Sequence, residues 1–261
     1  MKTTIRTIHA LTAAVAVLCC AAGVRGDDIW DQTAPSDDGC ADTNNELIHG
    51  ARQVHDLQGG GGTFLDADWA RVQQRKYRSY EARYVSSPLG LAANHMPALH
   101  TCAGVVKVGQ PYDGAAQDAA SLRWLSTGDS DIFVRVRSGA IQGNLSLYEI
   151  QLFETTYSVP RFNNSATQLT LLVVQNTRAD AVAGEIHFFD ASGSAIYSHP
   201  FTVAARGVLV LNTAGLAPVA GQSGSMLVAH DGGYGALSGK AVALEAATGF
   251  TFDTLLSPKP Y

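Results

Sequence analysis

Apolar and polar residues alternate with a period of two in several short segments of the first half of the chain. The clearest are residues 80–84, 132–136 and 148–152, with shorter candidates at 51–57, 68–73 and 121–126. On a half-buried strand this period turns one set of side chains inward and leaves the other set in solvent, as in antiparallel sheets. We therefore expect Tyr80 and Tyr84 in a core and Glu81 on a solvated face.

The second half of the chain repeats this pattern. Residues 85–119, with several prolines and glycines, predict a loop, and residues 154–160 predict a short hinge. Strands are then expected at 168–175, 185–189, 195–203, 207–211, 225–229 and 240–244. Asp190 to Gly193 suits a short hairpin with glycine in the left-handed conformation. No segment has the pattern of an amphipathic helix.

Many short strands separated by turns predict an all-β fold. Residues 27–154 hold 10 basic and 17 acidic residues, a net charge of −7, whereas residues 155–261 hold 5 and 6, a net charge of −1. This change of composition predicts two consecutive antiparallel β-sandwich domains, of jelly-roll or Ig-like type, at residues 47–154 and 155–261.

Residues 1–26 have the layout of a secretory signal peptide. Lys2 and Arg6 precede an apolar stretch, and either Gly23 or Gly26 suits the cleavage site. The stretch of about 13 residues is shorter than the roughly 20 that cross a hydrocarbon core. We expect no membrane span and a protein that is secreted, extracellular or at the cell surface, with the periplasm as the other possible destination.

Export bears on the two cysteines that remain after the signal peptide. Cys40 and Cys102 should form a disulfide in an oxidising compartment. The bridge closes a loop of about 60 residues and would stabilise the fold by roughly 4 kcal/mol on the chain-entropy model. Residues 27–46, rich in acids and turn formers, predict an extended acidic arm that Cys40 pins to the rest of the protein.

Composition and motifs exclude several functions. The formal net charge is −5 and the 18 basic residues are scattered, which argues against a nucleic-acid partner. The chain has no H-E-x-x-H or phosphate-binding loop, and the segment from Gly221 to Ser225 lacks the closing glycine of a nucleophile elbow. We therefore expect no catalytic residues. Rings that could form a binding face are better placed for core packing, namely Trp69, Tyr77, Tyr80, Tyr84 and Trp124.

The first half resembles the bacterial pre-peptidase C-terminal domain family over roughly residues 45–153. The resemblance is carried by Glu46 to Gly50 (ELIHG), Asp66 to Val72 (DADWARV), Tyr80, Asp129 to Val134 (DSDIFV) and Tyr148 to Leu152 (YEIQL). It implies a small jelly-roll-like sandwich and an appended, non-catalytic module of secreted proteins, which sometimes binds matrix polymers or calcium. Within this first half, Cys102 lies in an insertion relative to the pre-peptidase C-terminal family. The second half is similar to uncharacterised Ig-like repeats of secreted bacterial proteins.

Two metal sites are conceivable. Calcium prefers six to eight hard oxygen ligands, and candidate donors are Asp42, Asn44, Glu46, Asp66 and Asp68. The resemblance implies that acids of the arm and of the first strand share such an ion. The alternative is that acidic residues at every second position of a strand simply form its solvent-exposed face. His95, His100 and Cys102 could hold zinc or copper if the cysteine were not already bridged.

These observations favour a secreted, non-catalytic binding or adhesion module for an extracellular polysaccharide or protein. One alternative is a structural subunit that assembles with itself when its arm pairs with the sheet edge of another copy. A second alternative is an unrecognised secreted hydrolase.

Overall fold

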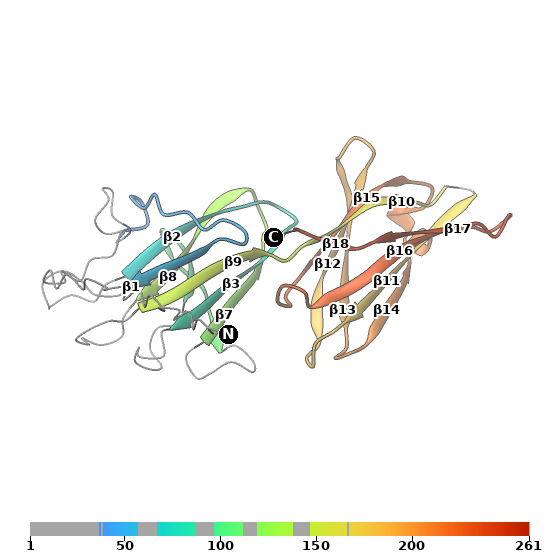
Figure 1. The fold of residues 1–261 in the computed structure, drawn as a ribbon. Coiled ribbons are helices and arrows are strands. Elements are labelled where there is room, and N and C mark those ends of the chain that lie inside the picture. The colour runs from blue at the N-terminus through green and yellow to red at the C-terminus, as the bar shows by residue number, and fades with distance from the viewer. Residues whose placement is uncertain are drawn as a thin grey trace, which may run out of the picture.

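The computed structural model describes residues 37, 39–56, 67–86, 97–111, 119–137, 147–165 and 167–260. The expected signal peptide and most of the arm, residues 27–36, lie outside this set. The described chain consists of antiparallel strands and two short 3-10 helices, Thr213–Gly215 and Ala217–Val219. It forms two lobes that lie end to end, with the C-terminus at their junction (Figure 1).

Nine strands belong to the N-terminal lobe, which runs to residue 154: β1 (Arg52–Asp56), β2 (Ala67–Gln74), β3 (Ser79–Ser86), β4 (Ala98–Thr101), β5 (Gly104–Val108), β6 (Gln110–Pro111), β7 (Ala119–Leu125), β8 (Ser130–Arg137) and β9 (Leu147–Glu154). They form two sheets, with the orders β1-β9-β3-β7-β6 and β2-β8-β4-β5. Alternate residues of both sheets share one hydrophobic cluster that includes Val72, Tyr84, Leu122, Val134 and Ile150. The lobe is therefore a β-sandwich.

The remaining strands belong to the C-terminal lobe: β10 (Tyr157–Asn163), β11 (Gln168–Asn176), β12 (Val182–Asp190), β13 (Ala195–Val203), β14 (Val208–Asn212), β15 (Ser223–His230), β16 (Leu237–Glu245), β17 (Thr251–Leu255) and β18 (Ser257–Pro258). Their sheets have the orders β13-β12-β15-β10-β18 and β14-β11-β16-β17. A second hydrophobic cluster between them includes Phe162, Leu172, Ile186, Phe188 and Val228. The all-β sandwich fold predicted from the sequence is confirmed.

The disulfide predicted from the sequence is present. Cys40 lies in the turn that begins at Gly39, and Cys102 lies at the tip of the β4–β5 hairpin, with 5.5 Å between their Cα atoms. The arm beyond Cys40 then follows β2, where the Leu47 amide donates to the Arg71 carbonyl at 2.9 Å. The described part of the arm thus lies on the edge strand of its own sheet.

Three expectations about local structure need correction. Part of the expected loop at 85–119 forms β4, β5 and β6. β4 is buried at three consecutive residues and β5 is exposed along its whole length, so neither strand has the period-two pattern. The expected hinge continues into β10, although Pro160 lies within it, and the register of β10 on β15 shifts at that point. Glu81 was expected in solvent but is fully buried, because the C-terminal lobe covers its face of β3. The hairpin at Asp190 is confirmed, with Gly193 at φ 86°.

Candidate functional site

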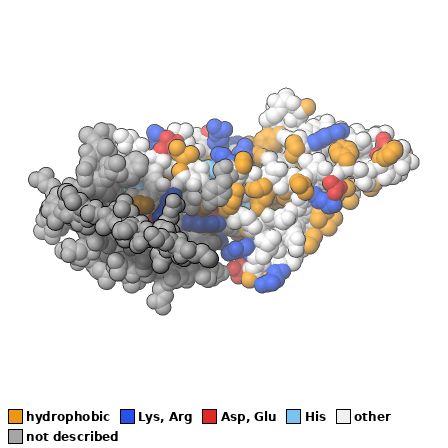
Figure 2. Space-filling model, in the orientation of Figure 1, with side chains coloured by type: hydrophobic (Ala, Val, Ile, Leu, Met, Phe, Trp, Pro, Cys, Tyr) orange, Lys and Arg blue, Asp and Glu red, His pale blue; other side chains and the backbone are white. Residues whose placement is uncertain are grey.

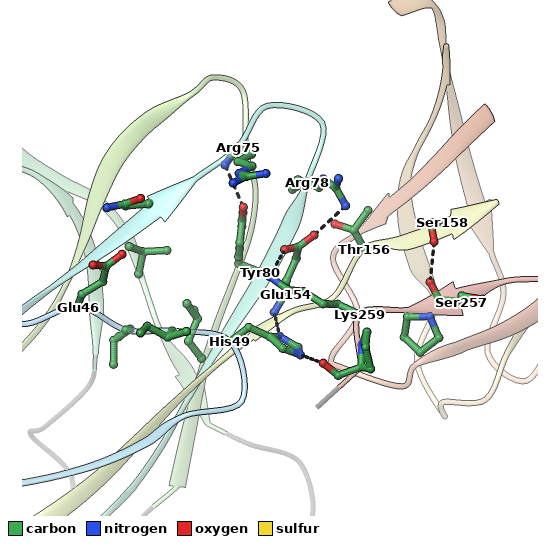
Figure 3. A pocket seen from close by; sticks show the side chains of 17 residues that line it. Glu46, His49, Arg75, Arg78, Tyr80, Glu154, Thr156, Ser158, Ser257 and Lys259 are labelled. Atoms are coloured by element: carbon green, nitrogen blue, oxygen red, sulfur yellow. Dashed lines mark hydrogen bonds and ion pairs between the residues drawn. The ribbon is translucent and has the colours of Figure 1, made fainter. Parts of the chain in front are cut away.

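A pocket of about 670 Å³ lies between the two lobes (Figure 3). Its walls come from the arm, from the turn that joins β2 to β3, from the end of β9 and from the C-terminal residues 257–260. The charged and titratable side chains at the pocket are Glu46, His49, Arg75, Arg78, Tyr80, Glu154 and Lys259. Both lobes therefore contribute to one concave surface.

The pocket has an excess of positive charge. Arg78 contacts Glu154 at 2.8 Å and Lys259 contacts the same carboxylate at 3.0 Å. Among the described residues, no carboxylate pairs with Arg75, while Glu46 is paired with Arg71 at 3.4 Å. Figure 3 shows Arg75 and Arg78 on one side of the pocket, with Glu154 between them and Lys259. With three cations and two carboxylates, the described lining has a net charge of +1 in a protein whose net charge is −5.

His49 is tied into the wall by both ring nitrogens. Its Nδ1 accepts from the backbone N–H of Glu154 at 2.8 Å, so its Nε2 donates to the Pro260 carbonyl at 3.1 Å. Burial and the nearby Lys259 lower the pKa of His49, which keeps this neutral tautomer. The Tyr80 hydroxyl accepts from the Arg75 amide at 2.9 Å, and burial raises its pKa. These groups hold the pocket together.

The polar groups of the described pocket lining do not form a catalytic set. Glu154 is bound by two cations, and the Ser158 hydroxyl donates to the Ser257 carbonyl at 3.3 Å. A nucleophile needs a base within hydrogen-bond reach that is itself free to take a proton. No serine, histidine and acid of the described lining stand in that relation.

A buried ion cluster fixes the two lobes beside the pocket. The Glu81 carboxylate accepts from Arg123 and contacts Arg83, each at 2.8 Å, and accepts from the Tyr234 amide of the C-terminal lobe at 2.9 Å. Burial acts to raise the pKa of Glu81, but the two arginines and the amide outweigh it and the pKa is lowered. A Cβ at Gly233 would meet a Glu81 oxygen at 2.9 Å, so a larger residue there would displace the carboxylate.

Further contacts cross the junction on other sides. The Ser79 hydroxyl accepts from the His230 amide at 3.1 Å, and the Tyr234 ring packs on the Phe153 ring, with 5.1 Å between centroids. The Tyr77 ring packs on the His187 ring, with 4.7 Å between centroids. The contacts join the lobes on several sides, so the pocket between them is preformed.

The residues predicted to bind calcium are not gathered into one site. Asp42 and Asn44 are exposed, and Glu46 faces Arg71. Asp68 points inward, where it accepts a hydrogen bond from the Tyr148 hydroxyl at 2.6 Å. Asp66 lies outside the described residues, and the described chain contains no group of three or more ligand side chains that could hold a metal. The described members therefore do not fit a calcium ion, and no step below relies on one.

The second metal set is equally dispersed. Cys102 is bridged to Cys40, which removes it as a thiolate ligand. His100 is buried against the Trp69 ring at 5.0 Å, and burial lowers its pKa. His95 lies outside the described residues.

The aromatic side chains mostly pack inside, as the sequence predicts. Tyr80, Tyr84 and Trp124 are buried in the core of the N-terminal lobe. Trp69 is half-buried beneath Arg135, 5.3 Å from its ring, and Tyr77 contacts the other lobe.

Sequence reasoning missed the basic side of the pocket. The local signal is the run Arg75-Lys76-Tyr77-Arg78, three cations in four residues within a chain of low charge. Nothing in the sequence indicates that Lys259 joins them, because that depends on how the C-terminal segment folds back.

Comparison with known proteins adds little. No protein-family model matches the chain, and no curated protein does. Among solved structures, the adhesin domain of Epf from Streptococcus pyogenes is similar over 80% of this chain and 78% of its own, with 9% identity and a TM-score of 0.24. A TM-score this low supports no conclusion about fold or function. Within the described residues, no helix is long and apolar enough to cross a membrane.

Proposed function

We propose that the protein is a secreted, non-catalytic binding module that holds an extracellular polysaccharide or protein in the pocket between its lobes. The observation that carries the proposal is the preformed, positively charged surface made by Arg75, Arg78 and Lys259. The resemblance of the first half to the pre-peptidase C-terminal family agrees with an appended binding role, and the disulfide suits an oxidising, extracellular setting.

The charge of the pocket defines the ligand class. The lining holds Arg75, Arg78 and Lys259 against two carboxylates: Glu154 is shared by Arg78 and Lys259, and Glu46 is paired with Arg71 outside the pocket lining. A ligand with a carboxylate or sulfate group beside Arg75 therefore gains most from entering. Binding should weaken as salt rises, because the arginine at position 75 is exposed and screened by ions. Acidic polysaccharides and acidic protein segments are therefore the expected partners.

Retention on insoluble polymers tests the proposal. The chain after signal removal is incubated with peptidoglycan, collagen, cellulose, chitin and an acidic polysaccharide gel, at low and at high salt. We expect retention on an acidic polymer and its loss in the double variant Arg75→Glu, Arg78→Glu.

The matched control is Arg137→Glu, an exposed arginine at the other end of the β2–β8 pair. Its partner Ala67 is eight residues from Arg75, so Arg137 lies roughly 26 Å from Arg75 along the strands, at about 3.3 Å per residue. Equal retention of the double variant and the control would remove the pocket as the binding surface. Failure of every polymer and of acidic protein ligands would remove the proposed function itself.

A further inference from the structure

The outer face of the sheet β14-β11-β16-β17 is mostly aliphatic, with Gln175, Asn212, Ser238 and Thr251 toward the strand ends. Its registered pairs include Val173 with Val210 and Leu171 with Val242. Residues paired across antiparallel strands point to the same side of a sheet, and their neighbours Leu172 and Val174 point into the core. We call the outward set the aliphatic face: Leu169, Leu171, Val173, Val208, Val210, Val242, Leu244 and Leu255.

The outer face of the other sheet in the same lobe is different. There the outward positions mix Glu185, Ser198 and Ser225 with Leu227 and Ala229, and His187 is buried against Tyr77 of the N-terminal lobe. The aliphatic face is therefore specific to one sheet. Val210 is 61% exposed and Leu255 is 71% exposed, and Figure 2 shows hydrophobic side chains gathered on this lobe. A continuous apolar surface of this kind marks an interaction site.

Charge on the aliphatic face indicates what covers it. Lys240 and Asp253 lie on it and form an ion pair, each about half exposed. The face thus has no net charge. In a pair of copies related by a twofold axis, Lys240 of each copy can face Asp253 of the other. A lipid surface is less suited, since the face has neither the tryptophan and tyrosine nor the basic excess of interfacial anchors.

The size of the face also suits a second copy. Its strands have 5, 9, 9 and 5 residues. At about 3.3 Å per residue and about 4.8 Å between strands, the plane area is roughly 450 Å² per copy. Two such faces reach roughly 900 Å², a little below the ~1,000 Å² of a stable specific interface, which corresponds to a weak, transient dimer. Sheets pack face to face about 10 Å apart in sandwiches, so the geometry of such a pairing is ordinary.

We propose that two copies of the chain pair through the aliphatic face to form a twofold dimer. This dimer is independent of the pocket between the lobes and leaves the pocket open, because the two surfaces have no residue in common. It also differs from assembly through the N-terminal arm, whose described part lies on β2 of its own lobe.

Sedimentation velocity of the full mature chain, from about 1 to about 300 µM, tests the proposal, since small interfaces give micromolar affinities. We expect the mass to double with concentration. Val210→Glu places a charge in the centre of the face and should raise the dimer dissociation constant at least ~10-fold. The matched control is Val106→Glu, a valine of β5 that is 56% exposed and should leave the dimer unchanged.

Several results would overturn the proposal. A monomer at every concentration would overturn it. If that monomer pelleted with vesicles of phosphatidylcholine and phosphatidylglycerol, the face would be assigned to a membrane. A dimer that Val210→Glu leaves intact would assign self-association to another surface, such as the arm. Circular dichroism of Val210→Glu confirms its fold, which an exposed position should preserve. If that variant were unfolded, Leu255→Glu at the sheet edge provides the same test.

Discussion

Replacing Glu81 with glutamine removes the buried charge that joins the two lobes while keeping the shape of the side chain. The carboxylate is fully buried, whereas Arg83 and Arg123 remain 29% and 28% exposed. Breaking a fully buried pair costs about 3–5 kcal/mol. Because both guanidinium groups can rehydrate and glutamine still accepts from the Tyr234 amide, we expect a smaller loss of about 2–3 kcal/mol.

Urea unfolding provides the assay. Tryptophan fluorescence follows the N-terminal lobe through Trp69 and Trp124, and far-ultraviolet circular dichroism follows both lobes. Glu81→Gln should lower the fluorescence midpoint and separate it from the circular dichroism midpoint, because the lobes lose part of their coupling.

The control for this variant is Glu149→Gln, which breaks an ion pair with Arg52 that is exposed on both sides. Surface pairs contribute at most about 1 kcal/mol, so its effect should be small. If the two variants lost equal stability, or if Glu81→Gln left both midpoints unchanged, the ion cluster would not couple the lobes and the preformed pocket would need another explanation.

Three further changes test other parts of the structure. Burial lowers the pKa of His230 to about 4 from an ordinary 6.5. As the pH falls, the unfolded chain takes up the proton first, so the free energy of unfolding should fall by up to about 3 kcal/mol between pH 6.5 and 4. His230→Phe should flatten this pH dependence, measured by urea unfolding at each pH. Cys40→Ala with Cys102→Ala should cost roughly 4 kcal/mol by the chain-entropy estimate, measured by thermal unfolding, and no loss would show that the bridge does not constrain the unfolded chain. Tyr148→Phe leaves buried Asp68 without its hydroxyl donor and should cost about 1–3 kcal/mol, a result that an unchanged melting temperature would contradict.

The sequence predicted most of the core because alternation is local. Tyr80, Tyr84, Leu122 and Ile150 each lie in a segment whose own period turns them inward, and each is buried. The same rule failed for Glu81, whose face is covered by a lobe that begins more than 70 residues later. Local patterns describe a single sheet and contain no information about what lies on its other side.

The candidate pocket likewise combines a local signal in the sequence with contacts from distant segments that the sequence does not reveal. The run from Arg75 to Arg78 is visible in the sequence as a local concentration of charge, but its meaning depends on Lys259 and Glu154, which come from distant segments. Asp68 was expected either as a calcium ligand or on a solvated face, but it shares the buried face of β2 with Ala70 and Val72. The Tyr148 hydroxyl, which comes from a distant strand, supplies its hydrogen bond there.

Hydrogen exchange of the chain bound to the polymer or protein that retains it tests the central claim most directly. The account predicts slower exchange at the turn from Arg75 to Tyr80 and at the amides of Ser257 and Lys259, because both segments line the pocket between the lobes. Exchange elsewhere, including β5 and the aliphatic face, should be unchanged at constant protein concentration. Protection confined to those other surfaces, with the pocket segments unaffected, would contradict the claim that the ligand binds between the lobes.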